Sequence, residues 1–500
     1  MIRSLFKDML GYLPAQLVPA VAGIVFLPVI TRFLPPEEYG HYTLVMATVS
    51  VLTVLTSWVS IAVVRFYPAC KDEETLKALY GSIFVWLGLS VAALAVVFLS
   101  VTLALAQVIP ARLFGAMLLG VFLFVLLAVS DVLQSLLRVR RLVHWYTVST
   151  VWKGLAGLGL GIWLAIAWNS GVKGLLWGSI LAVALTIPFL WAVSTRGVRF
   201  GLGDFSFNLS KEMAKYSFPL AAGNLAAWIL SLSDRYVLEF FRGSFEVGLY
   251  SASYRVSESS IMLLTSLFAF AFNPLSIIVW EKQGEGTGRR FLEQGTRYFL
   301  ILCLPAVVGL SVLQKPVVSV LTGREYWEGA SVLPWVAAGV FFLGLTQRFG
   351  AGMSFLKRTT PSMLCILAAG GLNLILNFAF IPSFGFKAAA ISTTVSYAFL
   401  LALTVWVSRR FFRWAFPFGS LIRVVIASTV MGAAIYPIGK AISSSQVINL
   451  IVAIASGVLL YAIVLLLLGE IQPNEKRALK QLVARHLPGR FTPASWEKKF

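Results

Sequence analysis

Apolar segments, each long enough to cross a membrane as a helix, follow one another along the whole chain. They lie near residues 10–32, 43–64, 79–108, 112–137, 146–168, 173–194, 216–238, 247–279, 297–321, 331–354, 361–382, 387–410, 420–440 and 446–469. A helix needs about 20 predominantly apolar residues to span the hydrocarbon core of a bilayer. Only 12% of the 500 residues are charged, whereas soluble domains carry about 25%. The sequence therefore predicts an all-α polytopic membrane protein with 14 transmembrane helices.

The distribution of Lys and Arg predicts how these spans are oriented. An even number of spans puts both termini on one side of the membrane, and about 30 of the 41 basic residues fall on that side. Nine fall on the opposite side, and Lys153 and Arg255 lie within spans. Because Lys and Arg collect in cytoplasmic loops, we expect both termini in the cytoplasm and the chain in the plasma (inner) membrane. The same rule explains the net charge of +20 without a nucleic-acid partner.

Two stretches roughly 200 residues apart share the same order of features. One runs from Pro14 to Tyr42 and ends TRFLPPEEYGHY; the other runs from Pro219 to Tyr250 and ends DRYVLEFFRGSFEVGLY. Each has a proline near the start of a span, an arginine near its outer end and a Gly-x-Tyr after an acidic turn. Further on, the motif GVKG at 171–174 corresponds to GFKA at 385–388. Six spans therefore repeat as six spans in the same orientation, a pattern typical of transporters that rock two bundles around a central site.

This repeat predicts the domain organisation of the chain. We expect two pseudo-symmetric six-helix lobes, two additional C-terminal helices and a monomer. The predicted units are an N-lobe at 1–195, a cytosolic linker at 196–215, a C-lobe at 216–412, spans 13 and 14 within 413–470, and a basic cytosolic tail at 471–500.

Three motifs, taken in order, connect the chain with a known family. They are LPVITRFLPPEEYGHY, then SIAVVRFYPA at the end of span 2, then the DRYVLEFF…VGLYSASYRV unit of spans 7 and 8. Over nearly its whole length the chain resembles the polysaccharide (O-antigen type) flippases of the multidrug/oligosaccharidyl-lipid/polysaccharide exporter superfamily. The resemblance implies two lobes that face each other across a central cavity. It also implies that undecaprenyl-diphosphate-linked glycans cross the membrane by alternating access.

Charged and polar residues within the spans fall on one face of each helix. Span 8 carries Ser251, Arg255 and Glu258 at helical spacing, which places them on one face. A charge at the centre of a helix costs at least about 2.5–3.5 kcal/mol, so we expect this face to point to the bundle interior or a watery cavity. Two interpretations of Arg255 remain open. It is a cavity cation for a diphosphate or an acidic sugar, which a guanidinium holds bidentately, or it forms an intrahelical pair with Glu258.

The other candidate substrate-binding residues lie near the ends of spans. Arg65 ends span 2 at the cytosolic side, where the resemblance favours the cavity mouth and an interfacial anchor is the alternative. Arg32 and Arg235 are expected near the outer rim, and the neighbouring Asp234 favours a local structural role for Arg235. Trp228, on the polar face of span 7, is either a sugar-stacking residue or part of an interfacial belt.

Four residues are candidates for ion coupling to H⁺ or Na⁺: Asp131, Lys153, Asp234 and Glu258. A buried ion pair is the simplest interpretation of Asp131 and Lys153, and a titrating proton site is the alternative. Arg348, near the end of span 10, is expected to anchor the cytosolic interface. The three His and three Cys residues are scattered, so the sequence predicts neither a metal nor any other cofactor.

Three classes of function are consistent with a chain of this kind. The first is a glycolipid flippase, with a lipid-linked glycan and membrane lipids as its partners. The second is an ion-coupled multidrug or toxin antiporter of the same superfamily, which would favour an acidic cavity for organic cations. The third is a membrane glycosyltransferase or polymerase. No predicted outer loop is long enough for a paired-carboxylate site, so the sequence favours a transporter without catalytic residues.

Overall fold

The computed structural model describes residues 2–356, 358, 360–441, 445–470 and 475. Most of the predicted basic tail lies outside these residues. The described residues form helices and contain no strand. The α-helices are α1 (Ile2–Phe33), α2 (Pro36–Phe66), α3 (Glu73–Ala104), α4 (Ala111–Val139), α5 (Val143–Ala167), α6 (Val172–Ser194), α7 (Phe207–Leu232), α8 (Asp234–Arg242), α9 (Ser244–Val312), α10 (Gln314–Leu321), α11 (Leu333–Phe355), α12 (Thr360–Ser408), α13 (Phe418–Ala441) and α14 (Gln446–Leu467).

The prediction of an all-α polytopic membrane protein is confirmed. Among the described residues, 11 helices are long and apolar enough to cross a membrane. Two of them, α9 and α12, are interrupted by non-helical glycines, Gly284 and Gly385, and each supplies two spans. The less apolar α7 supplies the remaining one, which brings the total to the 14 predicted spans. Both glycines have a positive φ, 79° and 59°, a conformation that favours glycine.

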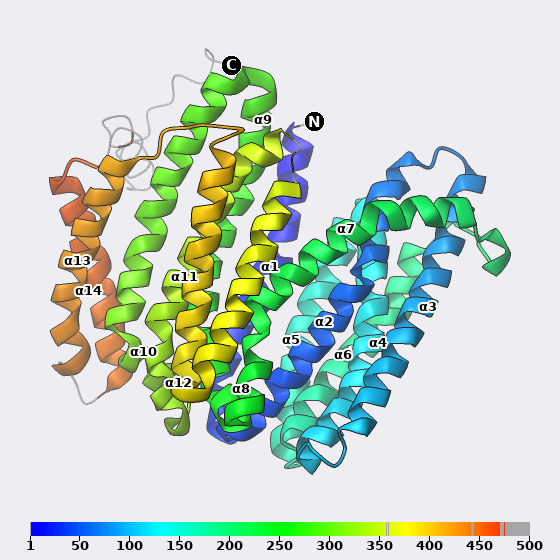
Figure 1. Ribbon diagram of the computed structural model, residues 1–500, viewed down its shortest axis with the longest axis horizontal. Helices are drawn as coiled ribbons and strands as arrows, with labels where there is room; N and C mark the ends of the chain where they lie inside the picture. Colours follow the sequence, from blue (N-terminus) through cyan, green and yellow to red (C-terminus); the bar gives the residue numbers. More distant parts are fainter. Residues whose placement is uncertain (1, 357, 359, 442–444, 471–474, 476–500) are drawn as a thin grey trace, which may run out of the picture.

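Span 7 is organised differently from the predicted continuous helix. The chain breaks at Ser233, so Asp234 and Arg235 open the separate short helix α8. The start of α7 lies at Phe207 because the hydroxyl of Ser206 accepts a hydrogen bond from the Leu209 N–H at 3.4 Å and caps the helix. Pro219 lies inside α7, which runs obliquely across the bundle (Figure 1).

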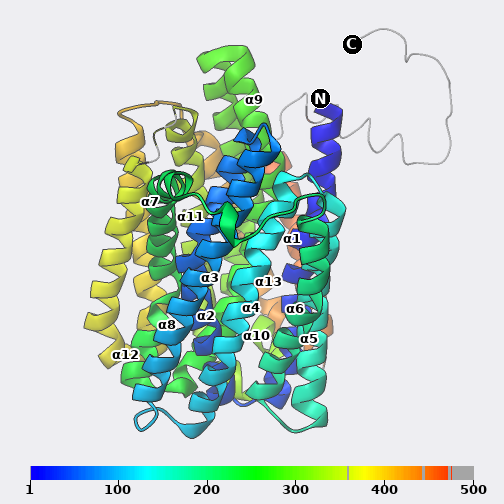
Figure 2. The ribbon, with the colours of Figure 1, turned by 90° about the vertical axis from the view of Figure 1, so that its right-hand side faces the viewer.

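The same pairing of helices occurs in both halves of the chain. In the first half α1 packs against α5, α2 against α4, and α4 against α6. In the second half α7 packs against α12, α9 against α11, and α11 against α12. Helices α13 and α14 pack against each other and against α9, at the edge of the bundle in Figure 1. Helix α1 begins and α14 ends at the same end of the bundle (Figure 1), where the break in α9 projects beyond the other helices (Figure 2).

Candidate functional site

The two halves touch closely at the end of the bundle where α2 and α9 begin. The helices cross so closely that a β-carbon at Gly40 would overlap the carbonyl oxygen of Ser244, and one at Gly248 would overlap that of Pro36. These are the two glycines of the repeated Gly-x-Tyr motif. Glycine is required here because only a residue without a side chain lets the two backbones meet. We call this crossing of Gly40 and Gly248 the outer contact, after the orientation predicted from the sequence.

The opposite end of the halves is closed by aromatic side chains of α7. Phe218 stacks on Trp58 of α2 with the ring centroids 4.9 Å apart, and Tyr216 meets Phe66 edge-on at 6.2 Å. The guanidinium of Arg65, the candidate for the cavity mouth, lies 5.8 Å from the centre of the Tyr216 ring. We call these contacts between α7 and α2 the inner contact. Arg65 is therefore part of a closed junction between the halves.

Between the two contacts lies a cavity of about 270 Å³, lined by α1, α2, α5, α7, α8 and α9. Its charged residues are Arg235, Arg255 and Glu258, and its hydroxyl groups come from Tyr39, Tyr42, Thr43, Ser251 and Tyr254. We call it the central cavity. Because it takes walls from both halves and holds more positive than negative charge, it is suited to an anionic group.

Arg255 extends from α9 across this cavity to α1. Its Nη2 would lie 2.9 Å from a β-carbon placed on Gly23, so the guanidinium rests against the glycine backbone. Within the described residues Arg255 forms no hydrogen bond or ion pair, and in particular none with Glu258. The intrahelical pair that we considered from the sequence is therefore not formed. All the donor groups of Arg255 remain available to a ligand.

Arg235 lines the same cavity but is engaged with the protein. Its Nη1 lies 3.1 Å from Oδ1 of Asp234 and donates to the Ser231 carbonyl, also at 3.1 Å. Its guanidinium faces the rings of Tyr250 and Tyr254, at 5.6 and 4.9 Å from their centres. The structure thus forms the local pair expected for Asp234 and Arg235. Asp234 therefore partly neutralises the positive charge that Arg235 contributes to the central cavity.

A polar cluster extends from Asp234 into α12. The carboxylate accepts hydrogen bonds from the Tyr250 hydroxyl and from Thr393 at 3.3 Å. Asn373 donates to Thr393 at 3.3 Å, and Asn377 donates to Asn373 at 2.9 Å. The Oδ1 atom of Asn377 is buried and has no hydrogen-bond partner among the described residues. Carboxylate, amide and hydroxyl oxygens are the ligands that hard cations prefer, so this cluster is a candidate ion site.

Asp131 and Lys153 do not form the ion pair that their positions suggested. Lys153 Nζ donates to Ser130 at 2.9 Å, and the Asp131 carboxylate accepts a hydrogen bond from Ser60. No ion pair joins the two residues in the part of the chain that the structure describes. The prediction of a direct pair is wrong because serines from α2 and α4 supply nearer partners. Both groups nevertheless lie in the same polar region of the first half.

Three further arginine and tryptophan predictions have different outcomes. Arg32 is exposed and donates to the Val320 carbonyl at 3.3 Å, outside the central cavity. Trp228 packs against Tyr236, with ring centres 5.9 Å apart, and does not line the central cavity. The prediction that Arg348 anchors the interface is wrong, because its side chain is only 1% exposed and lies inside the second half. Three phenylalanine rings surround its guanidinium, those of Phe268, Phe272 and Phe299, at 5.0 to 5.9 Å.

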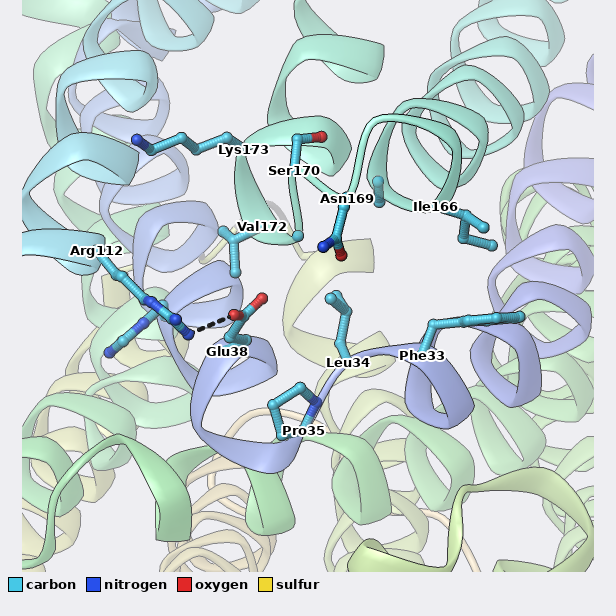
Figure 3. A pocket seen from close by; sticks show the side chains of 13 residues that line it. Phe33, Leu34, Pro35, Glu38, Arg112, Ile166, Asn169, Ser170, Val172 and Lys173 are labelled. Atoms are coloured by element: carbon cyan, nitrogen blue, oxygen red, sulfur yellow. Dashed lines mark hydrogen bonds and ion pairs between the residues drawn. The ribbon is translucent and has the colours of Figure 1, made fainter.

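A separate pocket of about 570 Å³ lies in the first half at the start of α2, and Figure 3 shows the side chains that line it. Arg112 pairs there with Glu38 at 2.7 Å. The Glu38 carboxylate lies so close to Gly171 that a β-carbon would overlap it, and Glu246 lies in the same way against Gly385. Glu246 also accepts a hydrogen bond from the Phe386 N–H at 2.9 Å and so caps a helix start. A glutamate thus packs against the first glycine of each repeated motif, GVKG at 171–174 and GFKA at 385–388, and the pocket lies beside the first of these two contacts.

An ion-pair network at the end of the bundle where α14 ends was not predicted from the sequence. Arg297 of α9 pairs with Glu470, just after α14, at 2.6 Å and with Glu475 at 2.7 Å. Arg423 of α13 lies 3.1 Å from the second oxygen of Glu470. Burial acts to raise the pKa of Glu470, but hydrogen bonds from Ser420, Arg297 and Arg423 outweigh it and hold this pKa below its ordinary value. The network joins α13 and α14 to the second half.

Comparisons with known proteins agree with this architecture. The family model described as polysaccharide biosynthesis protein matches residues 5–277, more than half of the chain. The chain is 22% identical over 304 residues to a probable low-salt glycan biosynthesis flippase, Agl15, of Haloferax volcanii. It is 24% identical over 322 residues to the succinoglycan biosynthesis transport protein ExoT of Rhizobium meliloti. The match to Agl15 covers 61% of this chain and 63% of that protein, and the match to ExoT covers 63% of this chain and 61% of that protein. The chain therefore spans somewhat less than two thirds of the length of each relative.

Solved structures show the same fold at low sequence identity. The lipid II flippase MurJ in an inward closed conformation superposes with a TM-score of 0.75 at 17% identity, over 90% of this chain and 96% of that one. An inward-facing multidrug resistance transporter of the MATE family gives 0.66 at 14% identity, over 79% and 94%. The chain therefore has the fold shared by these two groups of membrane transporters.

Proposed function

The chain belongs to the family of polysaccharide biosynthesis proteins, and we propose that it flips a lipid-linked oligosaccharide or polysaccharide repeat unit from the inner to the outer leaflet. The carrier lipid in this proposal is undecaprenyl diphosphate. One observation carries it: Arg255 presents an unpaired guanidinium in a cavity between the two halves. An unpaired cation in the membrane interior is costly, and the planar guanidinium fits the oxygens of a diphosphate.

In this proposal the outer and inner contacts open in turn. Opening of the inner contact, where Arg65 lies against Tyr216, would admit the diphosphate from the cytoplasmic leaflet. Arg255, with Arg235 beside it, would hold the diphosphate in the central cavity. Opening of the outer contact at Gly40 and Gly248 would release it. The helix pairings repeated in both halves support two lobes that move as units around the cavity, with both termini in the cytoplasm of a plasma membrane protein.

A multidrug antiporter is the alternative, and the charge of the central cavity argues against it. Organic cations need acidic groups, whereas this cavity has two arginines and one glutamate. We also propose transport rather than glycosyl transfer, because the matched relatives are named as flippases and transport proteins. Neither alternative explains an unpaired arginine at the junction of the halves as directly as a diphosphate ligand does.

We extend the proposal to ion coupling at Asp234. Its carboxylate connects Arg235 of the central cavity with the oxygens of Thr393, Asn373 and Asn377. A proton or Na⁺ bound there would weaken the hold of Asp234 on Arg235, and the freed guanidinium would then bind the substrate more strongly. Asp234→Asn should make transport insensitive to the ion gradient. A variant that keeps full gradient dependence would exclude Asp234 as the coupling residue.

The test of the proposed function is a reconstituted flipping assay. Purified protein in vesicles receives a lipid-linked oligosaccharide in one leaflet, and its appearance in the other is followed with and without imposed H⁺ or Na⁺ gradients. We expect protein-dependent flipping that Arg255→Ala abolishes. Equal flipping by vesicles without protein, or export of organic cations in place of the glycolipid, would contradict the proposal.

A further inference from the structure

A second cavity lies inside the second half of the chain. Its volume is about 800 Å³, and α7, α9, α11 and α12 form its walls. It extends from the level of Glu258 and Tyr397 to Phe355 and Ser362 at the inner ends of α11 and α12. This volume lies within the range of about 300–1,000 Å³ typical of ligand sites. We call it the C-half cavity. Glu258 lines both this cavity and the central cavity, so the two meet at that residue.

The polar lining of the C-half cavity is almost entirely uncharged. Hydroxyl and amide groups supply it, among them those of Ser231, Asn273, Ser276, Thr346, Gln347 and Tyr397. Among the residues that the structure describes, Glu258 is the one charged residue of the lining, and no Lys or Arg belongs to it. The central cavity, by contrast, is lined by two arginines. Two adjoining cavities therefore offer different chemistry, one suited to an anion and the other to a neutral group with many hydrogen-bonding sites.

The protein does not provide hydrogen-bond partners for all the polar groups of this lining, and Gln347 is an example. Its side chain is exposed although it lies within the membrane-spanning helix α11, eight residues before the end of that helix. Its amide forms no hydrogen bond with any described residue, and it offers two donors and one acceptor. Asn273 is likewise exposed, and among the described residues the only hydrogen bond of its side chain is one from Arg348 at 3.4 Å. Polar groups within the bilayer require partners, which a hydroxyl-rich ligand would provide.

We propose that the C-half cavity binds uncharged sugar residues of the glycan while Arg255 holds the diphosphate in the central cavity. This inference rests on the proposed function and adds the substrate class to it. Sugar hydroxyls both donate and accept hydrogen bonds, as the amide of Gln347 does. Acidic sugars are disfavoured, because Glu258 lies at the junction and no Lys or Arg among the described residues lines the cavity. The chain therefore selects glycans whose first sugars are neutral.

Binding to the purified full-length chain tests this inference. The probes are undecaprenyl diphosphate, the same lipid carrying a neutral oligosaccharide, and the same lipid carrying an oligosaccharide of uronic acids. We expect the neutral glycolipid to bind about tenfold more tightly than the other two. Gln347→Leu should weaken binding of the neutral glycolipid about 3- to 10-fold, as expected for one or two lost hydrogen bonds. Binding of the bare lipid diphosphate and the thermal midpoint of the protein should not change.

Two threonines provide a matched control. Thr346 lines the C-half cavity and Thr429 is exposed on α13, and each donates to a carbonyl of its own helix at 2.9 Å. Thr346→Val should weaken binding of the neutral glycolipid, whereas Thr429→Val should not. If the wild type binds all three lipids equally and Gln347→Leu changes nothing, the inference is overturned while the proposed function stands. If the wild type binds none of them, the proposed function itself fails and the inference with it.

Discussion

Three arginines within the membrane-spanning region have three different environments. Arg255 has no partner among the described residues and faces the central cavity. Arg235 lines the same cavity but is paired with Asp234. Arg348 is buried among phenylalanine rings and donates one long hydrogen bond to Asn273. Of the three, only Arg255 can offer its full charge to a ligand, which is why the proposed function depends on it.

Arg255→Ala should therefore abolish transport without loss of stability. Hydrogen bonds to charged groups contribute about 1.5–3 kcal/mol, so binding of the lipid diphosphate should weaken about 10- to 100-fold. The thermal midpoint should not change, because the guanidinium has no protein partner to lose. Arg255→Lys should restore only part of the activity, since a point charge replaces a planar fork. The measurements are flipping in vesicles and thermal unfolding of the same preparations.

A double variant distinguishes a role of Arg255 in ligand binding from a structural pair between Arg255 and Glu258. Arg255→Ala combined with Glu258→Ala leaves no lone charge, so a purely structural pair would regain transport in it. We expect it to stay inactive, and a transporting double variant would show that Arg255 acts through Glu258. Arg112→Ala is the control, because Arg112 is 77% exposed at the outer end and outside the central cavity.

The sequence predicts the environment of some of these residues and fails for others. The helical spacing of Ser251, Arg255 and Glu258 was enough to predict a polar face, and the structure places all three around one cavity. Spacing along one helix carries no information on partners from distant helices. The phenylalanines around Arg348 are 49 to 80 positions away in the chain, and the sequence alone placed this arginine at the interface. The cluster of Asp234 with Thr393 was missed for the same reason.

At the scale of the helix, the repeat is explained by backbone geometry. Gly40 and Gly248 are the same position of the two halves, and each contacts the opposite half without a side chain. Gly171 and Gly385 share a positive φ, 55° and 59°, and each lies against a glutamate. The motifs that were visible in the sequence as a repeat are thus the positions where helices begin or cross. The sequence indicated their equivalence but not that Gly40 and Gly248 meet.

Gly248→Val should hold the outer contact open. The valine side chain would overlap the Pro36 carbonyl, and overpacking of this kind costs about 1–3 kcal/mol, enough to favour the open state about 5- to 100-fold. Ser251→Cys, which lines the central cavity, would serve as the reporter. A membrane-impermeant maleimide added from outside should label it faster in the Gly248→Val background, and transport should fall.

The matched control for that experiment is Gly159→Val on α5, where a side chain would meet no atom within 4 Å. It should leave labelling and transport as in the wild type. Unchanged labelling of Ser251→Cys with Gly248→Val would mean that the crossing of α2 and α9 does not close the outer side.

At the scale of the whole molecule, the apolar segments determined most of the fold. The bilayer core offers no water to the backbone N–H and C=O groups, so apolar segments of this length satisfy their hydrogen bonds by forming helices. The order of the spans follows the prediction, whereas α7 extends into the predicted linker 196–215 and α9 fills the predicted gap at 280–296 apart from its break at Gly284. The oblique course of α7 and the break at Ser233 do not follow from hydropathy. They bring Tyr216 and Phe218 onto α2 and so close the inner side.

The orientation of the molecule gives a direct prediction. In a background with Cys70, Cys303 and Cys365 replaced by serine, a single cysteine at Val108 should be labelled from outside and one at Gly286 from the cytoplasmic side. Val108 is 77% exposed in the turn after α3, and Gly286 is exposed just after the break in α9. The turn at Gly243 is less suitable, because its φ of 81° would strain a cysteine. Labelling of both positions from one side would refute the assignment of both termini to the cytoplasm.

The network of Arg297, Glu470 and Arg423 predicts a pH-dependent attachment of α13 and α14. Loss of one partner from a buried pair costs about 3–5 kcal/mol, so Arg297→Ala should lower the thermal midpoint while Arg423→Ala, whose guanidinium is half-exposed, should lower it less. The pKa of Glu470 is lower in the folded state. Its contribution to stability is therefore present above the unfolded pKa and is lost as the pH falls through the folded one. Glu470→Gln should remove this part of the acid sensitivity, measured as thermal midpoint against pH. An acid profile identical to that of the wild type would show that Glu470 does not hold these helices in place.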